Sequence, residues 1–260
     1  MRLDLERRRG TGEIIGDALQ LFFAHAPVFF TATLIVVAPV TILVDGVLGH
    51  EFTAGVNARP PAGVQLISVL LGAFVIPTLV TSLHVRAVQG LAEGIVPTVG
   101  GVLRQALALA PRVLPVVALY AVGVGLGFVA LIVPGIYLAT RWYFNAQAVV
   151  VDGHRGTAAL KASGTLVQGS WWRVFGTVLL LSITAGIIGY IIGGLLGLVV
   201  RLLTDSGAFY VVVQTFGQTI ALSISALGGT LLFFDLRREK GLTEEPLRGF
   251  LPPTHDAFGN

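Results

Sequence analysis

The sequence has no cysteine and little charge. The lack of cysteine excludes disulfides, thiolate catalysis and cysteine-ligated metal sites. Only 12% of the 260 residues are charged, whereas a soluble domain carries roughly 25%. At the same time 54% of the residues are hydrophobic. So little polar surface cannot cover a water-exposed globule, and the composition therefore indicates a chain embedded in a membrane.

Long apolar runs then define the fold class. Each is close to the roughly 20 residues with which a helix crosses the hydrocarbon core, and backbone amides in lipid must bond internally. We therefore predict an all-α, polytopic membrane helical bundle with about six transmembrane helices. A turn at Pro134-Gly135 separates the third run from the fourth, because proline cannot continue a helix there. The predicted spans are Val28–Leu48, Val64–His84, Val113–Val133, Gly135–Val151, Val174–Val200 and Tyr210–Phe234.

The distribution of Lys and Arg predicts the orientation. With the N-terminus inside, the inner segments hold 14 of these residues, whereas the outer loops hold only Arg59 and Arg201. Such a bias is typical of cytoplasmic loops, so we expect both termini in the cytoplasm of a bacterium and the bundle in its inner membrane. It also accounts for the net charge of +3 without a nucleic-acid partner. Residues 1–241 are predicted to form one integral membrane domain, and residues 242–260 a mobile cytoplasmic tail.

Three amphipathic segments precede the outward-going spans. Thr11–His25, Thr98–Ala110 and Gly156–Gln168 each separate apolar from polar residues at helical spacing, which predicts helices lying in the membrane interface. The first two align without gaps from Gly12 and Gly100. The chain is therefore either three repeats of one unit, an interfacial helix followed by a helical hairpin, or a chain whose Ala/Leu-rich helices look alike by composition.

A polar cluster is predicted in the outer half of the bundle. Arg141 lies within the fourth span, where a charge is costly and usually faces a partner or a cavity. Two interpretations stay open: an anion or lipid-headgroup site, or a structural ion pair between Arg141 and Asp45. The predicted members of this possible intramembrane cluster are Asp45, Arg141, Asn145, Gln214 and Gln218.

Small residues recur every four positions in the last two spans, which permits close approach of helix backbones. We expect an internal contact between spans five and six, with a dimer face as the alternative. The predicted helix-packing residues are Gly189, Gly193 and Gly197 in span five and Ala221, Ser225 and Gly229 in span six.

Several short motifs occur in an order that resembles a known family. They are Leu131–Ile136 with Pro134-Gly135, Val149–Gly153, Ala158–Ser163, Leu166–Gly169 with Trp172-Arg173, and Phe233–Arg237. In this order they resemble the membrane domain of the glycerophosphoryl diester phosphodiesterase family, which also exists as stand-alone bacterial proteins. The resemblance implies a six-helix membrane domain without the catalytic barrel. Asp152 stands where that family usually has a glutamate.

No catalytic or cofactor site is predicted. The triplet His154-Arg155-Gly156 matches the opening of the phosphodiesterase barrel, but no metal-spaced carboxylate pair follows, and too few residues remain for a barrel. The five histidines are far apart and form no pair at metal-ligand spacing. We expect no enzyme and no cofactor.

The sequence therefore favours a non-catalytic module that binds the lipid bilayer and serves as a scaffold, a lipid-binding module or a binding partner of another membrane or cytoplasmic protein. The alternative is a small transporter or lipid-handling protein that uses the polar cluster around Arg141.

Overall fold

The computed structural model describes residues 7–54, 59–95, 97–203 and 206–242. Within these ranges all regular structure is helical, as predicted. Five helical segments are long and apolar enough to cross a membrane. They are Ala26–Leu48, Ala62–Ala92, Leu107–Ala130, Trp171–Val199 and Gly207–Glu239. The tail predicted for residues 242–260 lies, apart from Leu242, outside the described residues.

The first two of these segments each change from α- to π-helix. Helix α2 (Ala26–Thr41) continues into η1 (Ile42–Leu48), and α4 (Ala62–Leu70) continues through η3 (Leu71–Val75) into α5 (Ile76–Ala92). A proline lies close to each change, Pro39 inside α2 and Pro77 at the start of α5. Proline has no N–H and therefore interrupts the backbone hydrogen bonds of an α-helix. A wider π-helical turn nearby accommodates that interruption. The short α3 (Glu51–Ala54) follows η1.

The middle of the chain is a hairpin with a broken second arm. Helix α6 (Val99–Ala130) is continuous, so the interfacial helix predicted for Thr98–Ala110 is wrong as a separate element. The chain reverses at Leu131, which is extended, and Pro134-Gly135 lies in the first turn of α7 (Ile132–Arg141). The reversal is therefore three residues earlier than predicted.

The fourth predicted span, Gly135–Val151, is not one helix. Helix α7 ends at Arg141, a turn occupies residues 142–144, and α8 (Asn145–Val150) follows. Ser163 of α9 (Thr157–Val167) stabilises this break: its hydroxyl donates to the Arg141 carbonyl at 3.0 Å and accepts from the Phe144 N–H at 3.1 Å. The predicted single helix was wrong because this distant hydroxyl satisfies the backbone groups that the break exposes.

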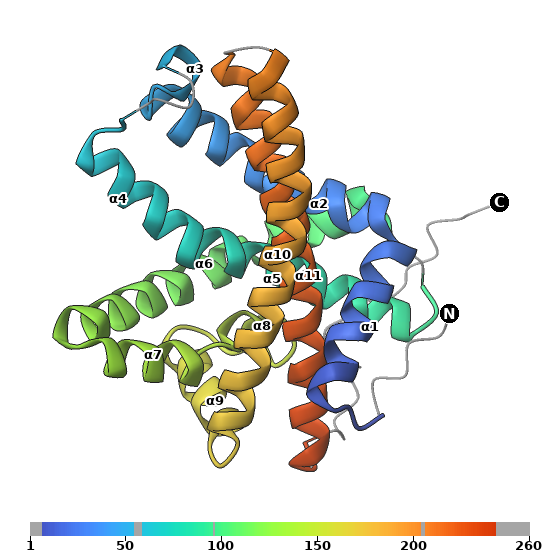
Figure 1. Cartoon of the computed structure of the whole chain (residues 1–260). Coiled ribbons are helices and arrows are strands. Elements are labelled where there is room, and N and C mark those ends of the chain that lie inside the picture. Colours follow the sequence, from blue (N-terminus) through green and yellow to red (C-terminus); the bar gives the residue numbers. More distant parts are fainter. Residues whose placement is uncertain (1–6, 55–58, 96, 204–205, 243–260) are drawn as a thin grey trace.

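The last two helices form the axis of the molecule. Helices α10 (Trp171–Leu203) and α11 (Gly207–Glu239) lie antiparallel, and α11 also contacts α1, α2 and α5 (Figure 1). In its most apolar window α11 is 78% buried, whereas α10 is 17% buried. Helix α11 is therefore the core element, and α10 covers one side of it.

The amphipathic first helix packs on protein. In α1 (Thr11–Ala24) the apolar face joins the core cluster that includes α11 residues such as Leu231 and Leu236. The helix itself was predicted, and α11 covers its apolar face; its location in the membrane interface stays a prediction. Its buried residues are Ile14, Ala18, Leu21 and Phe22.

Hydrogen bonds and ion pairs hold the segment before α1 against the start of α10 and the end of α11. The Arg9 backbone N–H donates to Asp235 Oδ1 at 2.8 Å, and Arg9 Nε contacts Asp17 at 2.8 Å. Arg173 pairs with Asp235 and Glu239 and donates to the Arg9 carbonyl at 3.0 Å. We call Arg9, Asp17, Arg173, Asp235 and Glu239 the clamp. It holds α1, α10 and α11 together at one end of the bundle.

Candidate functional site

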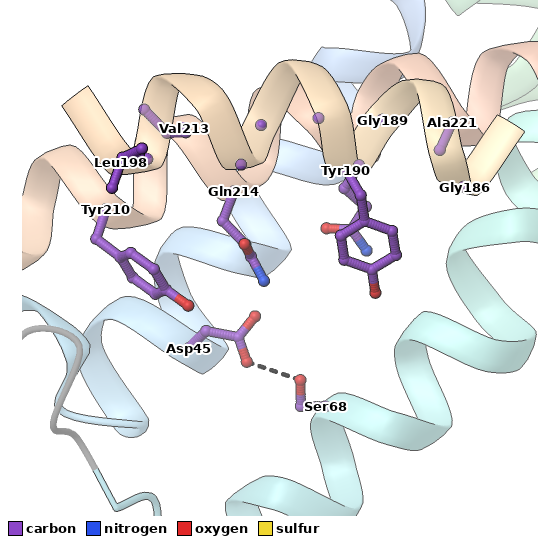
Figure 2. Close-up of a pocket in the computed structure, with 15 residues that line it drawn as sticks. Asp45, Ser68, Gly186, Gly189, Tyr190, Leu198, Tyr210, Val213, Gln214 and Ala221 are labelled. Carbon is purple, nitrogen blue, oxygen red and sulfur yellow. Dashed lines mark hydrogen bonds between the residues drawn. The ribbon is translucent and has the colours of Figure 1, made fainter. Parts of the chain in front are cut away.

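A cleft of about 620 Å³ lies between η1 and α4 on one side and α10 and α11 on the other. Asp45 lies on η1, and its Oδ1 accepts a 2.7 Å hydrogen bond from the hydroxyl of Ser68 on α4 (Figure 2). The π-helical turn and the nearby α-to-π change thus occur beside the two polar groups of this wall. Such irregular turns are frequent at functional sites.

The opposite wall supplies neutral polar groups and aromatic rings. Tyr210, Gln214 and Gln218 follow one another at four-residue spacing on α11, and so share one face of that helix. Tyr190 comes from α10. Figure 2 shows the side chains of Tyr210 and Gln214 pointing across the cleft toward Asp45. Glycines of α10, including Gly193 and Gly194, also line the cleft.

The cleft carries a single formal charge. Of the described residues that line it, only Asp45 is ionisable at neutral pH, and none is basic. Glu51 on α3 lies close enough to act on Asp45 electrostatically; burial and the Asp45 carboxylate raise the pKa of Glu51 above its usual value. The field in the cleft is therefore negative.

The structure divides the predicted polar cluster in two. Asp45, Gln214 and Gln218 line the cleft together, whereas Arg141 and Asn145 do not. Arg141 Nη1 donates to the Tyr137 hydroxyl at 2.8 Å, and its side chain lies against Gly164 of α9. The predicted ion pair between Arg141 and Asp45 is therefore wrong. The expectation assumed that spans one and four are neighbours, and α7 instead contacts α6, α9 and α10.

Asn145 belongs to the break between α7 and α8. Its Nδ2 donates to the Trp142 carbonyl at 2.9 Å, and its buried Oδ1 has no hydrogen-bond partner in the described part of the chain. Asn145 therefore caps a local turn, and its position gives it no contact with the cleft.

The small residues of the last two spans form the contact between α10 and α11. A Cβ atom on Gly189 would lie 2.6 Å from the Gly217 carbonyl oxygen and 3.0 Å from the Ala221 Cβ. A Cβ atom on Gly193 or Gly197 would lie farther from α11, at 3.5 Å and 3.8 Å from its nearest atoms there. Gly229 instead faces Tyr143, whose hydroxyl would lie 2.6 Å from a Cβ atom added at Gly229. Ser225 is half-buried.

Three polar members of the cleft were missed in the sequence. Ser68, Tyr190 and Tyr210 lie within predicted apolar spans, where a lone hydroxyl carries little signal. The four-residue spacing of Tyr210 with Gln214 and Gln218 was a usable pattern, since it places all three on one helix face.

No metal centre is formed by the described residues, among which no group of three or more His, Asp or Glu side chains converges. The most buried histidine, His84, is fixed within the core. Its Nδ1 lies 2.8 Å from the Val80 carbonyl, its Nε2 lies 3.5 Å from the Thr33 hydroxyl, and its ring stacks on Phe29. Its contacts are those of a structural residue.

Comparison of the chain with protein-family models, with curated proteins and with solved structures finds no match.

Proposed function

We propose that this protein is a non-catalytic integral membrane module that holds an amphiphilic molecule, a lipid or a lipid-like solute, in the cleft between η1, α4, α10 and α11. The observation that carries the proposal is the cleft itself. It combines Asp45, Ser68 and two glutamine amides with a volume of about 620 Å³, within the range of small-molecule sites. Ionisable groups within membrane segments are costly and commonly mark ligand pathways.

The surroundings of the cleft favour an amphiphile over a fully polar solute. Helix α4 has no buried residue, packs mainly on η1 and η3, and stands apart from α10 (Figure 1). Its apolar side chains, such as Leu66 and Val69, are exposed. In a bilayer these side chains face acyl chains, so a lipid tail can remain in the hydrocarbon while its polar head enters the cleft.

The contacts of the clamp support six crossings. The Arg9–Asp235 hydrogen bond holds the segment before α1 against the end of α11, so these two segments lie on the same side of the membrane. Only an even number of crossings satisfies that condition, whereas five helices are long enough to cross unbroken. Helices α7 and α8 together lie between the crossing of α6 and that of α10, and we propose that this pair makes the other crossing as a broken helix. Buried polar contacts tolerate such breaks within membranes.

The charge bias gives the direction. With 14 Lys and Arg residues in the segments on the clamp side, that side is proposed to be cytoplasmic, in the inner membrane of a bacterium. The cleft then lies in the outer half of the bilayer.

This six-crossing arrangement also agrees with the resemblance to the membrane domain of the glycerophosphoryl diester phosphodiesterase family, and membership in that family stays a prediction. So does the three-repeat organisation.

Filling the cleft tests the proposal. Gly194 lines the cleft, and a Cβ there meets no atom within 4 Å, so the side chain of Gly194→Leu has room to enter and would occupy part of the cleft. Gly125 on α6 has the same open surroundings outside the cleft, so Gly125→Leu is the matched control. Native mass spectrometry of the delipidated protein, titrated with total bacterial lipid, counts the bound molecules. We expect Gly194→Leu to lose the tightest-bound species and Gly125→Leu to keep it. Equal retention by both variants would contradict the proposal.

A second candidate is a carrier that moves the amphiphile between the two halves of the membrane. It is favoured by one observation: the cleft and the clamp lie toward opposite ends of the α10–α11 hairpin. A site open at one end and fastened at the other is one of the two states that alternating access requires. Transfer of a fluorescent lipid across proteoliposome bilayers, faster with the protein than without it, distinguishes the carrier from a binding module.

A further inference from the structure

The charge and the side chains of the cleft identify the class of head group. Asp45 is the only charged group among its described lining residues, and Ser68 occupies one lone-pair direction of its carboxylate at 2.7 Å. A carboxylate has about four acceptor positions, so others face the space between the helices. An anionic head group would meet this charge with no described lining cation to offset it. A cationic head group would neutralise it.

The remaining lining groups match an ammonium ion in particular. Two aromatic rings, Tyr190 and Tyr210, line the same space, and the faces of such rings attract cations. Gln214 and Gln218 add amide oxygens, which accept N–H hydrogen bonds. A carboxylate, amide oxygens and tyrosine rings around one cavity are suited to a group that carries a positive charge and several N–H donors.

We propose, on the basis of the proposed function, that the cleft selects an amphiphile with a primary ammonium head group. Asp45 pairs with the ammonium group, and the rings of Tyr190 and Tyr210 cover it. The tail extends between α4 and α10 into the bilayer. Glu51, beside Asp45 but outside the lining, strengthens the negative field without touching the ligand.

Three single-chain probes with the same tail test the head group. Dodecylamine, dodecanol and dodecanoate are titrated calorimetrically into delipidated protein in maltoside micelles at pH 7, with empty micelles as the blank. The amine should bind at least tenfold more tightly than the other two, as expected for a hydrogen-bonded charge pair. Equal affinities, or tighter binding of dodecanoate, would overturn the proposed head group.

Variants assign the preference to the cleft. Asp45→Asn keeps an oxygen for Ser68 but removes the charge, and should weaken amine binding at least tenfold. Glu51→Gln, the matched control, removes the neighbouring charge and should change amine affinity less than threefold. Tyr190 is 80% exposed and free to change without disturbing the core. Tyr190→Ala should therefore weaken binding about threefold while Tyr190→Phe keeps it.

Failure of the two proposals is distinguishable. If Gly194→Leu affects no probe, the cleft is not the binding site and the proposed function fails. If Gly194→Leu weakens all three probes alike and Asp45→Asn leaves their ranking unchanged, the cleft binds amphiphiles but the ammonium assignment is wrong. Competition of dodecylamine by short-chain phosphatidylethanolamine, and not by phosphatidylglycerol, would support a phospholipid as the source of the ammonium group; displacement by neither would support a single-chain amine.

Discussion

The two ends of the α10–α11 hairpin are held together by different kinds of contact. At the end near Trp171 and Glu239 the clamp joins three helices through Arg173 and the buried carboxylate of Asp235. At the end near Leu203 and Gly207 the helices meet through glycine backbones, and the space beside them is the polar cleft. One end is fixed by ion pairs and hydrogen bonds between charged groups. The other end keeps open space beside a polar surface.

The difference shows where this molecule can adapt. A buried ion pair fixes the relative position of its helices, because any displacement leaves a charge unpaired in a poor solvent for ions. Glycine contacts and an exposed helix such as α4 impose no such cost on movement. We therefore expect ligand-dependent change at the cleft end and little at the clamp end.

The largest effect is expected from removing the centre of the clamp. Asp235 is 2% exposed, and Asp235→Ala leaves both Arg173 and the Arg9 N–H without this acceptor. We expect a loss of about 3 kcal/mol in unfolding free energy, typical of breaking a buried pair. Unfolding in mixed micelles of increasing dodecyl sulfate content measures it.

The outer member of the clamp provides the control. Glu239 is more exposed, and Glu239→Ala leaves Arg173 paired with Asp235. Its loss should stay below about 1 kcal/mol, the usual range for a surface pair. Equal losses for the two variants would mean that burial does not distinguish the two carboxylates, against this description of the clamp.

A smaller effect is expected at the glycine contact. Gly189→Ala places a Cβ 2.6 Å from the Gly217 carbonyl oxygen, so α10 and α11 must separate, at about 1–3 kcal/mol. Gly193→Ala places its Cβ at an ordinary 3.5 Å from Gly217 and should be nearly neutral or slightly stabilising. Thermal unfolding in maltoside micelles compares the two. A larger loss for Gly193→Ala would place the closest backbone approach elsewhere.

The smallest effect is expected from acidification, which protonates Glu13 at the start of α1. The Gly10 backbone N–H and then Arg7 lower the pKa of Glu13, the exposed cap residue of α1, below its usual 4.5. Because the folded-state pKa is the lower one, this cap stabilises α1 fully above pH 4.5 and is lost as the pH falls through the folded value. Hydrogen exchange of the first α1 amides should quicken on acidification beyond the intrinsic trend, and in Glu13→Gln should show no such pH step.

The sequence predicted the helical membrane fold well because long apolar runs depend only on local composition. Five of the six predicted spans overlap helices long enough to cross. The fourth did not, because its break depends on Ser163, which is 22 residues after Arg141 in the chain and donates to its carbonyl. Similarly, nothing in the residues of α1 shows that its apolar face packs on α11.

Only part of the site could be predicted, because the contacts between distant helices are not visible in the sequence. Asp45, Gln214 and Gln218 were grouped by their depth in the membrane, and the structure places them around one cleft. Arg141 was grouped with them at similar depth, but depth does not determine which helices are neighbours. Arg141 pairs with Tyr137 one turn earlier on its own helix, a local contact that i, i+4 spacing could have indicated.

The absence of native cysteine allows the central claim, a ligand-responsive cleft opposite a fixed clamp, to be tested directly with spin labels. Labels at Leu66→Cys on α4 and Leu195→Cys on α10 report across the cleft, and labels at Phe23→Cys on α1 and Trp172→Cys on α10 report across the clamp; all four side chains are exposed. Double electron–electron resonance should give a broad distance distribution for the cleft pair that narrows and shifts with dodecylamine, and a narrow, unchanged one for the clamp pair. Equally narrow distributions at both ends, unaffected by dodecylamine, would contradict the account.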